Sequence, residues 1–187
     1  MKKLLLTAII ACSSLIAVSQ FKFPPLDKSP MDMSYWPPNY PLLKMNGKAN
    51  ELPVGRIIYG RPLKNNRSIF GGIVKYNELW RLGANEATEA EFFSNVKIGG
   101  KILPKGRYTV YCIPGENKWT MIFSKDNYVW GSFTYDNKKD VLRADADVDK
   151  NTETVEAFTM YFEETKSGAN LLILWDDVRA TLLIAVV

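Results

Sequence analysis

The residues best suited to chemistry lie in the stretch RLGANEAT, residues 81–88. Arginine offers a planar fork of donors that matches carboxylates and phosphates. Arg81 could therefore orient a polar ligand together with the neighbouring Asn85 and Glu86. Arg61, in the earlier stretch YGRP, could join them. This interpretation predicts a ligand-binding corner.

The same stretch also has a structural interpretation. Arg81 would pair with Glu86, and Asn85 beside Gly83 would stabilise a turn by bonds from its side chain to the backbone. The composition favours this structural corner over a ligand site, and both interpretations stay open at the level of sequence.

A second candidate is the aromatic stretch DNYVWGSFTY, residues 126–135. Sugars and cations stack on aromatic faces, and Gly131 with its loop-like flanks could leave Trp130 exposed beside Tyr128. Core packing is the commoner use of such residues in a small β domain, so it remains the favoured alternative.

Metal chemistry has weak support. Asp145, Asp147 and Asp149 occupy the first, third and fifth positions of a calcium loop. Lys150 stands where that loop requires glycine, and the flanks do not predict helices. In a strand, the three aspartates would share one solvent face. We therefore predict no metal site and no cofactor.

Catalysis is also poorly supported. The chain contains no histidine, the side chain that most often acts as a base near neutral pH. Cys112 lies in an apolar β-like run without an activating neighbour. We predict no catalytic residue and lean towards a protein that is not an enzyme. A hydrolase with two carboxylates, Glu86 among them, is the remaining catalytic alternative.

Residues 1–19 have the layout of a secretory signal peptide. Two lysines precede a short apolar run, and small residues follow at the expected cleavage point after Ser19. We expect an exported protein, periplasmic or associated with the outer membrane or secreted. A lipoprotein attached through Cys12 is the less favoured alternative, because the apolar run continues beyond that cysteine.

Charge and cysteine content limit the function further. Loss of the leader lowers the count of basic residues from 24 to 22, against 20 acidic ones. That balance, without a dense basic stripe, argues against nucleic-acid binding. Cys112 would be the only remaining thiol, which excludes an internal disulfide, and no other stretch is apolar for long enough to span a membrane.

Residues 20–53 hold seven of the ten prolines. Proline disfavours both helices and central strands, so we expect an extended arm. Its aromatic residues exceed what a linker needs and predict contact with the domain surface or with an envelope protein: Phe23, Tyr35, Trp36 and Tyr40.

Residues 54–187 alternate short β-like runs with Gly, Pro and Asn turns. The pattern predicts one antiparallel β-sandwich domain, of jelly-roll or immunoglobulin-like type, or an open barrel. Gly99 and Gly100 predict a tight hairpin. The final LLIAVV is apolar on both faces, which predicts a central, fully buried strand.

Three long stretches of the chain resemble the uncharacterised DUF2911 family. These stretches are YGRPLKNNRSIFGGIVKYNELWRLGANEATEAEFF, VKIGGKILPKGRYTVYCIPGENKWTMIFSK and WGSFTYDNKKDVLRADADV. The resemblance covers about residues 54–187. It implies a β-rich, secreted protein of Bacteroidota-type bacteria and brings no established activity.

Three functions follow, in order of preference. The first is a non-catalytic cell-envelope module that contacts another protein. The second is a module that binds a carbohydrate or another small ligand through Tyr128, Trp130 and Arg81. The third is the carboxylate hydrolase.

Overall fold

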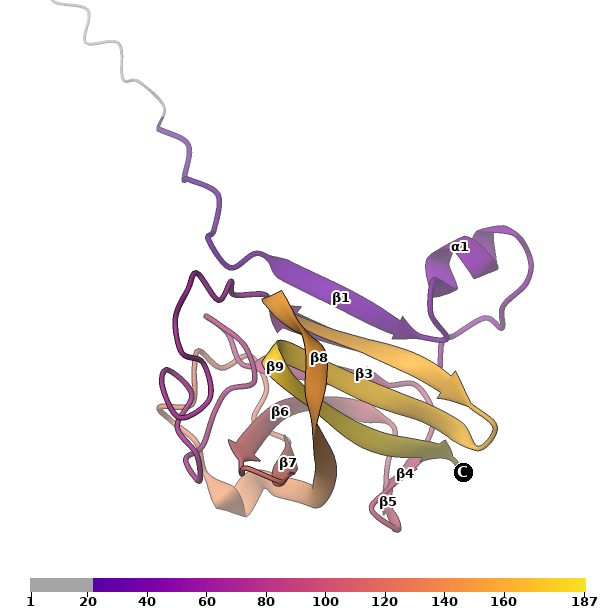
Figure 1. Ribbon diagram of the computed structural model, residues 1–187. Coiled ribbons are helices and arrows are strands. Elements are labelled where there is room, and N and C mark those ends of the chain that lie inside the picture. Colours follow the sequence, from indigo (N-terminus) through magenta and orange to yellow (C-terminus); the bar gives the residue numbers. More distant parts are fainter. Residues whose placement is uncertain (1–21) are drawn as a thin grey trace, which may run out of the picture.

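The protein is built on one antiparallel sheet of nine strands (Figure 1). The computed structural model describes residues 22–187. Its elements are β1 (Met31–Trp36), α1 (Tyr40–Met45), β2 (Gly55–Gly60), β3 (Thr88–Phe92), β4 (Val96–Ile98), β5 (Lys101–Leu103), β6 (Gly106–Pro114), β7 (Lys118–Ser124), the 3-10 turn η1 (Asn137–Lys139), β8 (Asp140–Thr165) and β9 (Gly168–Val186). The predicted all-β antiparallel class is confirmed.

The strands follow the order β1-β2-β3-β6-β7-β8-β9-β4-β5, and the sheet is not closed into a barrel. Alternation sets which side chains enter the core, because successive residues of a strand face opposite ways. In β3, for example, Ala90 and Phe92 are buried while Glu89 and Glu91 stay partly exposed, as their spacing predicts.

The hairpin predicted at Gly99 and Gly100 joins β4 to β5. Both glycines have positive φ, 55° and 79°, which a two-residue hairpin turn of this kind requires. The hairpin lies at one edge of the sheet, where β4 pairs with the end of β9.

Strands β8 and β9 are long and sharply bent (Figure 1). Their pairing shifts register between Lys150 and Val155 and again before Thr159, and Asp176 on β9 has a left-handed backbone. These irregularities let the second half of β8 turn back towards β1 and β2. Strand β9 is continuous through this bend.

A cluster of aromatic rings occupies the core near the bend. Trp80 packs edge-on against Trp119, with ring centres 6.0 Å apart, and is stacked on Trp175 at 6.2 Å. Phe158 contacts both Trp80 and Trp175. Removing such a ring typically costs about 3–5 kcal/mol, so this cluster holds the bent strands in place.

The end of the chain corrects one expectation. β9 lies between β8 and β4 and is central, as predicted. Leu182 and Ile184 are buried, but Leu183 and Val186 are more than half exposed. The expectation of burial on both faces is wrong, because the outer face of this part of the sheet has no covering layer.

The proline-rich segment belongs to the sheet for part of its length. β1 is an edge strand paired with β2, and the chain then forms the short helix α1 before returning at β2. The proline-rich segment was expected to contain no helix, and that expectation is wrong at α1. Pro41 lies in the first turn of this helix, where a missing N–H costs little. Trp36 and Tyr40 are buried.

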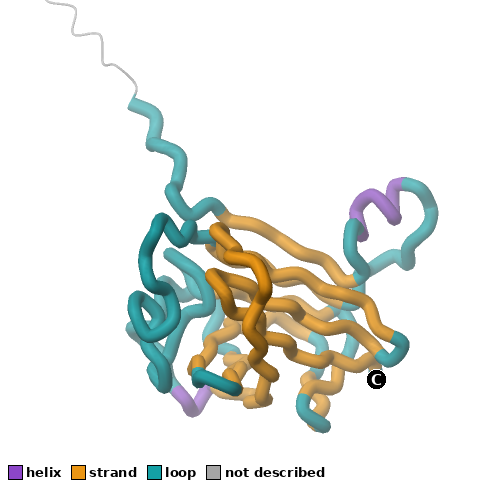
Figure 2. Tube along the Cα trace, viewed as in Figure 1, coloured by secondary structure: helices purple, strands orange, loops and turns teal. Residues whose placement is uncertain are grey.

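Two long connections gather at one end of the sheet, away from α1 and the C-terminus (Figure 2). The first, residues 61–87, joins β2 to β3, and the second, residues 125–136, precedes η1. Structureless loops of more than about 12–15 residues are uncommon in compact domains and often carry function. All the predicted ligand-binding residues lie on these two loops: Arg61, Arg81, Asn85, Glu86, Tyr128 and Trp130.

Candidate functional site

The backbone of residues 80–88 forms a tightly bonded corner. Leu82 and Asn85 have left-handed backbones. The Trp80 indole donates to the Gly83 carbonyl at 3.3 Å, and the Thr88 hydroxyl donates to the Leu82 carbonyl. The bonds of this corner run to main-chain carbonyls, and the Asn85 side chain donates to the Asp27 carboxylate and not to the backbone of the turn.

Gly60 and Gly83 let two parts of the chain approach closely. A Cβ at Gly60 would come 2.2 Å from the Ala84 carbonyl oxygen, and one at Gly83 would come 2.8 Å from the Gly60 carbonyl oxygen. Only glycine fits such contacts. This packing places the stretch YGRP directly against RLGAN.

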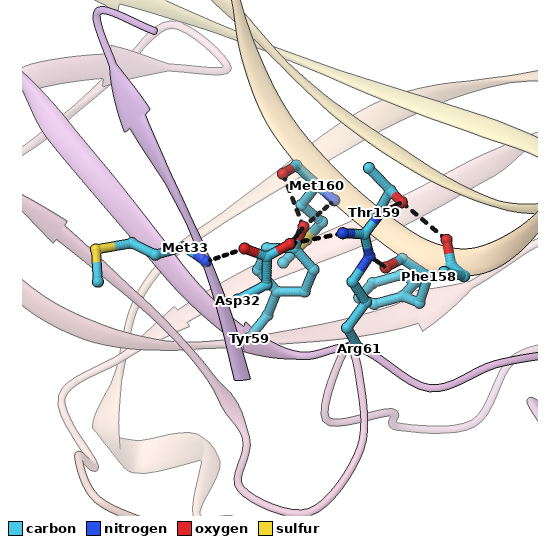
Figure 3. Close-up of polar contacts among 8 residues, drawn as sticks. Asp32, Met33, Tyr59, Arg61, Phe158, Thr159 and Met160 are labelled. Carbon is cyan, nitrogen blue, oxygen red and sulfur yellow. Dashed lines mark hydrogen bonds and ion pairs between the residues drawn. The ribbon is translucent and has the colours of Figure 1, made fainter. Parts of the chain in front are cut away.

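Arg61 is fully engaged in bonds within the protein (Figure 3). Its Nη1 pairs with the Asp32 carboxylate at 2.9 Å, its Nη2 donates to the Thr159 hydroxyl at 2.9 Å, and its Nε donates to the Phe158 carbonyl at 3.1 Å. These bonds join β1 and β2 to the bent part of β8. We infer that Arg61 is structural.

Tyr59 completes this junction. Its hydroxyl donates to the Met160 carbonyl at 3.1 Å and accepts from the Met160 N–H at 3.0 Å (Figure 3). Burial, as the largest cause, raises the pKa of Tyr59 to about 12. At Met160 a side chain thus satisfies both backbone groups of β8, whereas the backbone of Pro62 and Lys64 bonds to the nearby Phe158 and Glu156.

The bonding of the Arg81 side chain contrasts with that of Arg61. No hydrogen bond or ion pair joins its side chain to any group within residues 22–187, and its Nε is buried without a partner. Glu86 is exposed, so the predicted Arg81–Glu86 pair does not form. Burial lowers the pKa of the Arg81 guanidinium, which records the cost of desolvating a charge that has no counterion.

Arg81 lines a cleft of about 300 Å³ between the loop 61–87 and the core. Trp80 and Trp175 contribute to its wall, and Arg67 and Asn85 are further polar residues. The full lining is Ser29, Pro62, Arg67, Ile73, Val74, Trp80, Arg81, Gly83, Ala84, Asn85 and Trp175. This lining holds two cationic side chains and no carboxylate.

The N-terminal segment borders the cleft. Ser29 is part of the lining, and the Asn85 amide donates to the Asp27 carboxylate at 2.9 Å. Asp27 also accepts from the N–H of Ser29. The predicted arm therefore meets the ligand-binding candidate through Asp27 and Ser29.

The structure places the other predicted ligand residues beside this corner. Gly131 N–H donates to the Asn85 carbonyl at 3.0 Å, and Glu86 forms an isolated β-bridge with Trp130. Tyr128 and Trp130 are 79% and 60% exposed. The loop 125–136 thus lies against residues 85–87, with its aromatic rings in solvent.

The remaining predicted residues lie elsewhere. Phe23 is exposed and Tyr35 is partly buried, stacked on the buried Tyr40. Asp145, Asp147 and Asp149 share the exposed face of β8, as a strand requires. Lys118 pairs with the first of these aspartates and Arg179 with the last. Within residues 22–187, no group of His, Cys, Asp or Glu is arranged to hold a metal ion.

Comparison with known proteins identifies the family. Residues 44–184 match the family described as "Protein of unknown function (DUF2911)", so the chain belongs to that family. No curated protein and no solved structure matches the chain. Within the described part of the chain, no helix has the length and apolar character needed to cross a bilayer.

Sequence inspection alone did not select Trp175, which lines the cleft. Arg67 also lines the cleft, and Phe133 of the aromatic stretch 126–135 is 83% exposed. Arg67 is near Arg61 and Arg81 in sequence, which is the signal that associates it with them. Trp175 gave no such signal, because its run of aliphatic neighbours resembles ordinary core.

Proposed function

We propose that this protein is an exported, non-catalytic binding module that takes a small anionic ligand in the cleft lined by Arg81. The observation that carries the proposal is the Arg81 guanidinium, which is half-buried and has no partner within the described chain. An uncompensated buried charge is costly, and a bound carboxylate or phosphate would supply the missing partner.

The composition of the cleft supports an anion over a neutral or cationic ligand. Arg67 and Arg81 are its charged residues, and Ser29 and Asn85 can add neutral hydrogen bonds. A volume of about 300 Å³ lies at the small end of the range typical of ligand pockets. The indoles of Trp80 and Trp175 supply an apolar wall against the carbon skeleton of the ligand.

Binding without catalysis agrees with the chemistry of the cleft. The chain has no histidine, and Glu86 is not part of the cleft lining. Burial raises the pKa of Cys112 well above its ordinary value, which keeps this thiol protonated and inert. The same observations leave the carboxylate-hydrolase alternative without a general base in this cleft.

Export to the cell envelope is the second part of the proposal. It is supported by the leader-like residues 1–19, which include Cys12 and lie outside the described residues. Contact with an envelope protein through the aromatic arm has less support, because Trp36 and Tyr40 are buried within this chain.

Thermal unfolding with added anions tests the binding function. Phosphate, citrate, acetate and glucuronate would be titrated at constant ionic strength, set with sodium chloride. A ligand at a hundred times its Kd stabilises a protein by about 2.7 kcal/mol. We expect at least one of these anions to raise the Tm of the wild-type protein.

Matched arginine variants locate the effect. Arg81→Met should weaken the binding of that anion at least about tenfold, because a charge-assisted bond contributes about 1.5–3 kcal/mol. Arg179→Met is the control, since Arg179 pairs with Asp149 on the exposed face of β8 and β9. Equal responses of the two variants, or no response from the wild type, would contradict the proposal.

A further inference from the structure

The loop 125–136 displays three aromatic rings to solvent. Tyr128, Trp130 and Phe133 are 79%, 60% and 83% exposed. All the exposed large apolar side chains of this loop are aromatic. We call these three residues the aromatic platform.

The other side of the same loop packs against the sheet through two partly buried side chains. Val129 and Tyr135 pack against the buried Tyr111 and Ile122 on the face of the sheet opposite the main core. Folding by itself favours burial of the largest rings, since each aromatic side chain can remove about 150–250 Å² from water. The loop instead turns these rings outward, so burial in the monomer does not explain them.

Backbone bonds fix the loop in this orientation. Ala87 N–H donates to the Val129 carbonyl at 3.0 Å, and Gly131 N–H donates to the Asn85 carbonyl at 3.0 Å. The Thr109 hydroxyl also donates to the Asp126 carbonyl. A ligand that docks on the platform therefore meets rings whose supporting backbone is already ordered, which reduces the entropy lost on binding.

Individual rings are also held in place. Tyr128 has a left-handed backbone, φ 63°, an arrangement that costs energy for a bulky residue. Arg107 donates to its hydroxyl at 3.0 Å and lies 5.4 Å from its ring centre. Phe133 lies over Gly131, where an added Cβ would come 2.6 Å from the ring.

We infer that the aromatic platform binds a neutral polysaccharide with flat pyranose rings, such as a β-1,4-linked glucan. In these sugars the equatorial hydroxyls leave axial C–H groups on both faces of the ring. Those faces stack on aromatic side chains, and the hydroxyls at the ring edge bond to polar neighbours. Arg107 and Glu89 provide such neighbours beside Tyr128.

Local charges favour a neutral ligand. Arg107 is close to Glu89 and Glu91, with 3.7 Å between the charged atoms of each pair. Glu86 lies on the strand segment paired with Trp130. The surroundings are therefore balanced or slightly acidic, which disfavours nucleic acids and acidic sugars.

The extent of the platform favours a glycan over a protein partner. Its three rings together expose at most about 550 Å², given their exposed fractions and about 150–250 Å² for each aromatic side chain. A standard protein interface needs about 800 Å² from each partner. Polar residues such as Asn127, Ser132 and Thr134 separate the rings, so the apolar area does not extend into a continuous interface core.

Tryptophan fluorescence gives a selective measurement. All five tryptophans lie within the described residues, and Trp130 is 60% exposed while Trp36, Trp80, Trp119 and Trp175 are at most 9% exposed. Quenching by acrylamide, which is neutral and does not compete for the arginine cleft, therefore reports mainly on Trp130. We expect saturating cellohexaose to lower the quenching constant of the full chain at least twofold.

Variants separate stacking from other effects. Trp130→Ala should weaken binding to cellohexaose at least tenfold by calorimetry, with little change in Tm. Gly131→Ala, which pushes against Phe133 without removing a ring, should weaken it severalfold. Tyr161→Ala, which removes an exposed ring on β8, and Arg81→Met should both bind like the wild type.

The outcome is decisive in either direction. Protection by cellohexaose that depends on Trp130 and not on Arg81 supports the platform, whatever the anion titrations show. The inference is overturned if neither cellohexaose nor xylohexaose protects Trp130. It is also overturned if only hexagalacturonate protects it, or if Trp130→Ala retains full affinity.

Discussion

Two arginines of one loop, Arg61 and Arg81, end in opposite environments. Each of the three side-chain nitrogens of Arg61 donates a hydrogen bond to a partner at the junction of β1, β2 and β8. Arg81 is also partly buried and lies near the same glycine contact, yet its guanidinium has no partner within the described chain. Both residues belong to the segment between β2 and β3.

This difference separates a structural role from a binding role. A polar group that is buried and satisfied holds elements together, whereas one that is buried and unsatisfied reduces stability unless something else satisfies it. We therefore infer that Arg61 serves the fold, and the proposed function assigns the partner of Arg81 to a ligand. Substitutions at the two positions should change stability in opposite directions.

The largest effect is expected for Arg61→Met. The change leaves the Phe158 carbonyl, Thr159 and Asp32 without their shared donor. We expect the free energy of unfolding to fall by about 2–3 kcal/mol. This value is already reduced for the partial exposure of Arg61 and Asp32, each 38% exposed. Urea unfolding measures it.

The control is again Arg179→Met, whose exposed pair with Asp149 should contribute about 0.5 kcal/mol or less. Similar losses at positions 61 and 179 would show that the junction does not depend on Arg61.

Tyr59→Phe should have an intermediate effect. It removes the hydroxyl that serves both the N–H and the carbonyl of Met160, and we expect a loss of about 1–2 kcal/mol. The substitution also tests whether the junction is sensitive to alkaline pH, because Tyr59 has a pKa of about 12 in the folded protein.

The direction of this pH effect follows from proton binding. Between an unfolded pKa of about 10 and the folded value of about 12, the folded protein retains the proton that the unfolded chain loses. The unfolding free energy should therefore fall as the pH rises through this window. Tyr111 also has a pKa raised to about 12, mainly by burial. Tyr59→Phe should thus make the decline shallower without abolishing it, and an unchanged slope would contradict the assignment to Tyr59.

Arg81→Met should have the smallest effect and the opposite sign. The methionine removes a desolvated charge and fills similar space, so we expect the unfolding free energy to rise by about 1 kcal/mol. The measurement requires a buffer without multivalent anions, because a bound anion would stabilise the wild type. A loss of stability comparable to that of Arg61→Met would show that Arg81 is structural, and would remove the contrast between the two positions.

Local pattern predicted most of the strands. Ala90 and Phe92 alternate with glutamates, and Gly99 with Gly100 requires a turn, so β3 and the β4–β5 hairpin follow from nearby residues. Strand β1 was not predicted, because proline on both sides of it masked its pattern. An edge strand tolerates such neighbours, since one side of it needs no ladder partner.

The candidate site was predictable only by residue type. Arg61, Arg81 and Asn85 were all selected as polar residues near glycine, and nothing in their local sequence separates them. Their partners are distant in sequence: Arg61 bonds to Phe158 and Thr159, and Asn85 bonds to Asp27. The sequence also predicted an Arg81–Glu86 pair. That pair does not form, because the backbone is left-handed at Asn85 and Glu86 is exposed to solvent.

The family, the antiparallel β class and the lack of histidine could all be read from the amino-acid sequence, because each depends on composition or on periodicities of a few residues. The tertiary structure alone decided which arginine is satisfied and which is not. That outcome depends on how the bent strand β8 meets β1 and β2, a contact between residues about one hundred positions apart that no local pattern encodes.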